Sequence, residues 1–189
     1  MLFFSIPLVL TNLLQVLFNM ADIAVIGRFA GSLSLGAVGS TTTLVTLFTG
    51  ILIGMAGGIN VLVARFFGAK DKRSTVQIIH TAFLVSLAAG VIVLVLGMAF
   101  SKWILELLNT KAELLDGAVL YIRIYFLGMP ALALYNFGNA VCSAFGDTKK
   151  PLYYLAVAGV VNVVLNLFFV IVCKMDVAGV ATASIISQY

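Results

Sequence analysis

Long apolar stretches run through this sequence of 189 residues and constrain its fold more than any other feature. A membrane-spanning helix needs about 20 apolar residues. We place five spans near residues 3–27, 37–64, 76–100, 119–144 and 151–173, and the start of a sixth at 179–189. Hydrophobic residues make up 62% of the chain and charged residues 10%, which lies outside the range of soluble domains. The sequence therefore predicts an all-α membrane protein that has the lipid bilayer as its solvent.

The two ends of the sequence predict that the chain is a piece of a longer protein. It begins almost inside the first span, and it stops 11 residues into the sixth, too few to cross a membrane. Three interpretations stay open: one lobe of a longer protein, the product of a truncated gene, and a half-size subunit that pairs with a second copy.

The charged residues fall between the spans and indicate an orientation. One side carries six cations and two acids, net 6 − 2 = +4; the other carries five cations and four acids, net 5 − 4 = +1, and Asp22 lies inside the first span. The six clustered cations are Arg65, Lys70, Lys72, Arg73, Lys149 and Lys150. By the positive-inside rule we expect a cell-membrane protein whose N-terminus is cytoplasmic. Because the basic residues follow this topology, we expect no nucleic-acid partner.

Asp22 is an acid within a run of residues that could cross a bilayer. A carboxylate at membrane depth costs roughly 2.5–3.5 kcal/mol on insertion scales unless it is protonated, paired or bound to an ion. Asn12, Gln15 and Asn19 precede it at intervals of three, four and three residues, so on a helix all four form one polar stripe. The stripe predicts the wall of an aqueous cavity.

Two later spans carry polar groups of the same kind. Tyr135, Asn136 and Asn139 lie in the fourth span, and Asn162 and Asn166 lie one helical turn apart in the fifth. Amides in lipid need hydrogen-bond partners, so they either join helices or line a cavity. Asp22 among such oxygens could hold a proton, or a hard cation such as Na⁺.

Catalysis is not indicated by any motif. An intramembrane aspartyl protease needs two apposed acids, but Asp147 lies in a loop beside Lys149 and Lys150, far from the depth of Asp22. The sequence has no Ser/His/Asp set, metal-ligand cluster or phosphate-binding loop. We therefore expect no enzyme activity, no cofactor and no metal beyond Na⁺ at Asp22.

Three local patterns predict helix geometry. Gly50, Gly54 and Gly58 lie at intervals of four, a spacing typical of close helix packing in lipid. Gly128-Met129-Pro130 predicts a kink in the fourth span. Residues 101–117 alternate apolar and charged side chains, which predicts a short amphipathic helix at the outer surface, anchored by Trp103.

Several segments, in this order and spacing, carry a family resemblance. They are Pro7–Gly27 with its Asn-Met-Ala-Asp, Gly54–Lys70, Tyr121–Pro130, Ala144–Pro151 (Ala-Phe-Gly-Asp-Thr-Lys-Lys-Pro), Asn162–Asn166 and Val177–Ser184. Over nearly its whole length the chain resembles the multidrug and toxic-compound extrusion (MATE) transporters of the flippase-like exporter superfamily.

The resemblance implies the first lobe of a twelve-helix, two-lobe transporter that exports organic, often cationic compounds in exchange for H⁺ or Na⁺. Asp22 matches the coupling-ion acid of the family, Asn162 and Asn166 match polar positions near it, and Asn139 matches a further one. Gln15, Asn19, Asn12, Asn136 and Tyr135 are expected to line the cavity. Some members have a second acid where this chain has Asn166, so both coupling ions stay open.

Two other functions remain beside multidrug export. The first is a flippase for lipid-linked oligosaccharide or polysaccharide, whose cavity would need several cations, whereas only Arg123 lies within a span here. The second is a truncated product that transports nothing.

Overall fold

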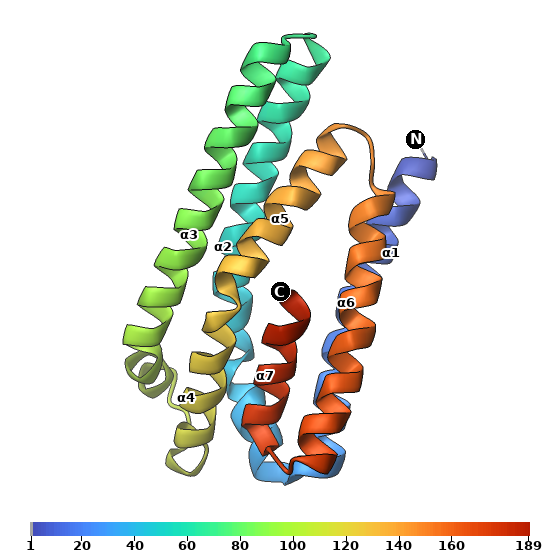
Figure 1. The fold of residues 1–189 in the computed structure, drawn as a ribbon. Helices are drawn as coiled ribbons and strands as arrows, with labels where there is room; N and C mark the ends of the chain where they lie inside the picture. Colours follow the sequence, from blue (N-terminus) through green and yellow to red (C-terminus); the bar gives the residue numbers. More distant parts are fainter. Residues whose placement is uncertain (1) are drawn as a thin grey trace.

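The computed structural model describes residues 2–189, without the side chains of residues 2–5, 7, 8, 12 and 19. These residues form helices joined by short turns, and no strand occurs among them (Figure 1). The helices are α1 (Leu2–Val25), α2 (Gly31–Gly68), α3 (Lys72–Leu107), α4 (Ala112–Leu127), α5 (Met129–Ala144), α6 (Lys149–Leu167) and α7 (Asp176–Gln188). Two π-helical turns, Ile26–Ala30 and Phe168–Val172, follow α1 and α6.

Three helical segments of the described chain are long and apolar enough to cross a membrane: Val9–Gly68, Lys72–Leu107 and Lys149–Val172. The first contains most of α1 and all of α2. These two helices run in opposite directions because the chain reverses at the π-helical turn (Figure 1). The pair α4 and α5 makes a fourth segment if the two helices count as one bent span. The chain is thus an all-α membrane protein, and the division into five spans and part of a sixth stays a prediction.

The predicted kink is confirmed, because α4 and α5 meet at Gly128 with a bend of 48°. The predicted amphipathic helix over residues 101–117 is wrong: α3 continues without a break to Leu107. The buried face of α3 explains this difference, since Gly97, Ser101 and Leu105 follow one another at helical spacing and all are buried.

Helix α3 packs tightly against the bent pair through two glycines. A Cβ on Gly90 would lie 2.7 Å from Pro130 Cα, and a Cβ on Gly97 would lie 2.4 Å from the Phe126 ring. Only glycine allows this approach, so we call the contact of these four residues the glycine seam.

The glycines predicted to pack on α2 do not do so within the described chain. Gly50, Gly54 and Gly58 are exposed, and a Cβ added to any of them, or to the adjacent Gly57, meets no atom within 4 Å. The prediction of tight packing there is therefore wrong within the described chain, because the neighbouring helices pack on another face of α2.

The turns between α2 and α3 and between α5 and α6 lie at the same end of the molecule, where α1 also begins (Figure 1). This end, which we call the basic end, carries all six clustered cations. Asp71 caps α3 here: its carboxylate accepts hydrogen bonds from the Ser74 backbone N–H at 3.1 Å and from the Ser74 hydroxyl at 2.6 Å. These bonds lower the pKa of Asp71, so its carboxylate stays ionised.

Candidate functional site

Asp22 lies in the last turn of α1, and its partner comes from α6. The side-chain amide of Asn166 donates a hydrogen bond to Asp22 Oδ1, joining residues 144 positions apart in the chain. Asn166 is fully buried and Asp22 is half-buried. The intramembrane acid therefore has a fixed neutral donor.

The hydrogen bonds continue from Asn166 into α7. Asn166 Nδ2 also donates to Asn162 Oδ1 at 3.1 Å, and Asn162 Nδ2 donates to the Ser184 hydroxyl at 3.4 Å. Ser184 in turn donates to the Val180 carbonyl of its own helix at 3.0 Å. Asp22, Asn166, Asn162 and Ser184 thus form one chain of polar groups across three helices, which we call the amide seam.

Gly159 sets the distance between α1 and α6. A Cβ at this position would lie 1.9 Å from ring atoms of Phe18, so only glycine lets the ring pack against the α6 backbone. Asn166 lies seven residues further on, two turns along the same face of α6. The close approach at Gly159 therefore brings Asn166 within reach of Asp22.

One oxygen of the seam has no partner. Asn166 Oδ1 is buried and accepts no hydrogen bond from any residue that the structure describes. A buried acceptor without a donor costs about 1–3 kcal/mol. This oxygen and the Asp22 carboxylate could both be ligands of a hard cation. Alternatively, a proton on Asp22 could supply the donor that Asn166 Oδ1 lacks. No group of three or more His, Cys, Asp or Glu that could hold another metal occurs among the described residues.

The predicted polar residues of α5 make other contacts. Asn136 Nδ2 donates to the Leu132 carbonyl at 2.9 Å, and Asn139 Oδ1 accepts from the Ser143 hydroxyl at 3.5 Å. The Tyr135 hydroxyl donates to the Pro151 carbonyl at 3.5 Å. Among the described side chains, none of these bonds reaches the amide seam.

The predicted stripe on α1 is described only in part. Gln15, which lies two helical turns before Asp22, is half-buried. The side chains of Asn12 and Asn19 lie outside the described residues.

Two further residues join helices without having been predicted to do so. Ser184 closes the amide seam, and Asn60 of α2 donates to the Ala140 carbonyl of α5 at 2.8 Å. Each was visible in the sequence as a polar residue in an apolar run. Asn60 has no second amide at helical spacing, and Ser184 carries a hydroxyl with Gln188 four residues on, so neither belongs to a pair of asparagines like Asn162 and Asn166.

The comparisons with known proteins identify the family. The MatE family model matches residues 7–168, most of the chain. This chain belongs to the MatE family. It is 31% identical over 185 residues to the probable multidrug resistance protein YpnP of Bacillus subtilis (strain 168). The match covers 98% of this chain and 42% of that protein. The chain thus spans about two fifths of the length of this relative.

The fold of this MatE chain matches solved transporters in two states. Against the outward-facing conformation of a multidrug resistance MATE family transporter the TM-score is 0.91 at 25% identity, covering 97% of this chain and 41% of that chain. Against the inward-facing conformation of such a transporter the TM-score is 0.86 at 25% identity, covering 92% and 39%. The chain therefore has nearly the same fold as the matching part of these transporters in both states.

Membership of the MatE family confirms the resemblance and the all-α membrane fold that the sequence predicts. Beside the probable multidrug resistance protein YpnP, the relatives include the multidrug export protein MepA of Staphylococcus saprophyticus, 25% identical over 190 residues, a match that covers 100% of this chain and 42% of that protein.

Proposed function

We propose that this chain is the ion-coupling lobe of a secondary active multidrug exporter, which expels organic, mainly cationic compounds in exchange for H⁺ or Na⁺. The observation that supports this function is the pairing of Asp22 with Asn166, whose second oxygen is buried and unpartnered. An ionised acid at membrane depth is costly, and binding a proton or a metal cation would neutralise it.

The arrival of either ion would change how α1 and α6 are held together. A protonated Asp22 can donate a hydrogen bond to Asn166 Oδ1 once the amide rotates, whereas the ionised form accepts from Nδ2. An Na⁺ ion would instead be shared between the carboxylate and Oδ1 and would displace the amide hydrogens. In each case the bond between the two helices differs between the free and the loaded lobe, which is the differential interaction that ion coupling requires.

The exported compound would bind between this lobe and a second one, near the bilayer midplane. The second lobe is either the remainder of a longer chain or another half-size subunit. The basic end would face the cytoplasm, since its cations exceed its acids by four, and this places the N-terminus on the same side.

Asp22→Asn in the full-length protein tests this function. The amide cannot take up a proton or neutralise Na⁺, so we expect gradient-driven efflux of a cationic dye such as ethidium from energised vesicles to be lost while membrane insertion is unchanged. Asp71→Asn is the matched control, because it makes the same substitution at an exposed carboxylate of the basic end. Undiminished efflux by Asp22→Asn would refute the proposal.

Imposing a pH gradient and an Na⁺ gradient separately on the same vesicles would identify the ion. If only one of them drives efflux, that ion is the coupling ion. If neither does while the protein is inserted, the chain belongs to the non-transporting class.

A further inference from the structure

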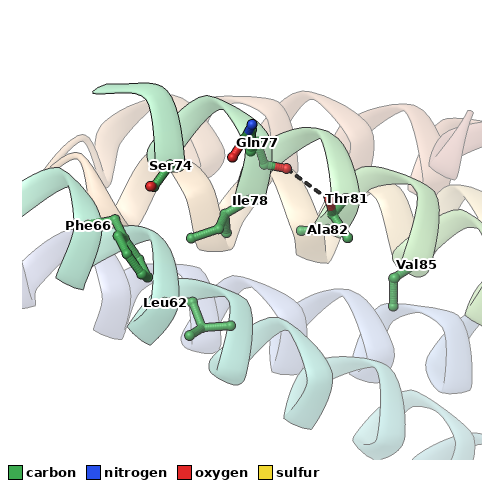
Figure 2. A pocket seen from close by; sticks show the side chains of 8 residues that line it. All are labelled: Leu62, Phe66, Ser74, Gln77, Ile78, Thr81, Ala82 and Val85. Atoms are coloured by element: carbon green, nitrogen blue, oxygen red, sulfur yellow. Dashed lines mark hydrogen bonds between the residues drawn. The ribbon is translucent and has the colours of Figure 1, made fainter. Parts of the chain in front are cut away.

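A groove lies between α2 and α3 beside the basic end, apart from the amide seam (Figure 2). It has a volume of about 440 Å³. Its walls are mainly apolar, with Leu62 and Phe66 from α2 and Ile78, Ala82 and Val85 from α3. Thr81 also lines it, and its hydroxyl is occupied by a hydrogen bond to the Gln77 carbonyl at 2.9 Å (Figure 2).

The groove changes character along its length. At the end near the α2–α3 turn it is bordered by Ser74 and Gln77, and at the far end by Val85 (Figure 2). Ser74 and Val85 are eleven residues apart, about 16 Å along the helix axis. A ligand that fits this shape has one polar end at the turn and an apolar tail.

Positive charge is concentrated at the polar end. The guanidinium carbon of Arg65 lies 5.8 Å from the centroid of the Phe66 ring, so a cation is held against a wall of the groove. Three more cations are exposed nearby: Lys70 in the adjoining turn, and Lys72 and Arg73 at the start of α3. The acid among them is Asp71, whose carboxylate accepts both of its hydrogen bonds from Ser74, and the local balance is 4 − 1 = +3.

We propose that this groove binds an anionic phospholipid of the surrounding bilayer, with an acyl chain along the apolar walls and the phosphate beside Arg65 and Arg73. Cations at the end of a membrane helix lie at the depth of lipid headgroups, where basic pockets between helices select anionic lipids. Arginine suits this role because its planar donors match phosphate oxygens. The proposal requires only a membrane protein and holds whichever compound or ion the protein transports.

Native mass spectrometry of the full-length protein tests the charge requirement. The protein is purified from vesicles that contain phosphatidylglycerol and phosphatidylcholine, and the retained lipids are counted. We expect phosphatidylglycerol to be retained preferentially, and we expect Arg65→Gln and Arg73→Gln each to weaken retention about fivefold, which about 1 kcal/mol per basic residue gives. Arg28→Gln and Lys174→Gln are the matched controls, because they remove exposed cations from the opposite end. Equal retention by all four variants would overturn the proposal.

Fluorescence quenching tests the location of the acyl chain. The native tryptophans, Trp103 among them, are first replaced by phenylalanine. Val85→Trp then places a reporter at the far end of the groove, and Val95→Trp places one at an exposed position of α3 outside it; Val85 is 48% exposed and Val95 58%, so both variants should fold. We expect brominated phosphatidylglycerol to quench the reporter at position 85 more strongly than brominated phosphatidylcholine, and both lipids to quench position 95 equally. Equal quenching at position 85 would mean that the groove does not select charge, and no quenching there would mean that another part of the protein covers it. Either outcome rejects the proposal.

Discussion

Where α3 crosses the bend between α4 and α5, the contact consists of two glycines, a proline and a phenylalanine, and it leaves no room for a single added methyl group. Where α6 meets α1 and α7, the contact consists of an acid, two amides and a hydroxyl, and one buried oxygen still lacks a donor. The glycine seam can exist in one arrangement only. The amide seam consists of groups that can either donate or accept, so our proposal assigns it the exchange of partners that an ion-responsive site needs.

The largest expected effect is on stability at the glycine seam. Gly90→Ala would place a Cβ 2.7 Å from Pro130 Cα and 2.9 Å from Ala133 Cβ, and neither atom belongs to a flexible side-chain end. We expect a loss of about 1–3 kcal/mol in the free energy of unfolding, as for other overpacked sites. Thermal unfolding in detergent would measure it.

Gly54→Ala is the matched control, because an added Cβ there meets no atom within 4 Å. Alanine favours helix over glycine, so this variant should be neutral or slightly stabilising. If both variants unfold alike, the glycine seam is not the rigid contact described here.

The next largest effect is on ion coupling at the amide seam. Asn166→Ala removes the donor to Asp22 and the acceptor that has no partner. Interhelical hydrogen bonds in membranes contribute about 0.6–1.7 kcal/mol, so we expect the affinity for Na⁺, which would lose the Oδ1 ligand, to fall by about three- to twentyfold. With H⁺ as the coupling ion the affinity should instead rise, because the ionised carboxylate loses its donor. The ion concentration that gives half-maximal dye efflux would report it.

Asn60→Ala provides the comparison for this variant, since it removes another amide that joins two helices, between α2 and α5. We expect it to lower the unfolding temperature without changing the ion dependence of efflux. An equal change in ion dependence would show that any amide contact between helices affects coupling.

A smaller effect is expected from Ser184→Ala, which removes the last donor-acceptor pair of the seam. The bond from Asn162 to Ser184 is 3.4 Å long and lies two residues away from Asp22 along the network. We expect a change of about threefold or less in ion affinity, the lower end of the range for such bonds. Ser184→Thr keeps the hydroxyl and should restore the original affinity, whereas a loss as large as that of Asn166→Ala would mean that α7 itself holds the ion.

The parts of the fold that depend on local sequence were predictable. Gly128-Met129-Pro130 gives the kink because glycine and proline act on their own helix. The end of α3 was not predictable in this way, because alternating apolar and charged residues are typical both of an interfacial helix and of the exposed end of a long one. The burial of Leu105 by neighbouring helices decided between them.

The candidate site was predictable as a set of residues but not as a set of contacts. Spacing placed Asp22 on one polar face and Asn162 with Asn166 on another. Their pairing depends on the register of α1 against α6, which the contact of Gly159 with Phe18 sets. A sequence alone also does not indicate which glycines lie against a neighbouring helix. The regular spacing of the α2 glycines predicts packing that does not occur, whereas Gly90 packs closely without any such spacing.

The smallest expected effect is at Asp71, whose carboxylate is exposed. Comparing it with Asp22 shows how a hydrogen-bonded acid behaves outside the membrane-spanning helices. Asp71 makes the same kind of contact, an acid that accepts hydrogen bonds from a neighbour, but it is exposed at the basic end. Its pKa is lowered by the bonds from Ser74. Its contribution to stability is therefore fully present above the unfolded pKa of about 3.9 and is lost as the pH falls through the lower folded value.

We accordingly expect Asp71→Ala to lower the unfolding temperature slightly at neutral pH, and the difference from the unmodified protein to shrink in strong acid, where the protonated carboxyl keeps an acceptor but loses its charge. Asp71→Asn keeps an acceptor for the α3 cap and should lose less than the alanine variant, with no pH dependence of its own. Thermal unfolding of the three proteins across acidic pH would measure this. If Asp71→Ala destabilised the protein as much as Gly90→Ala does, exposed polar contacts would matter as much as the glycine seam, and the contrast between a rigid apolar contact and an exchangeable polar one would fail.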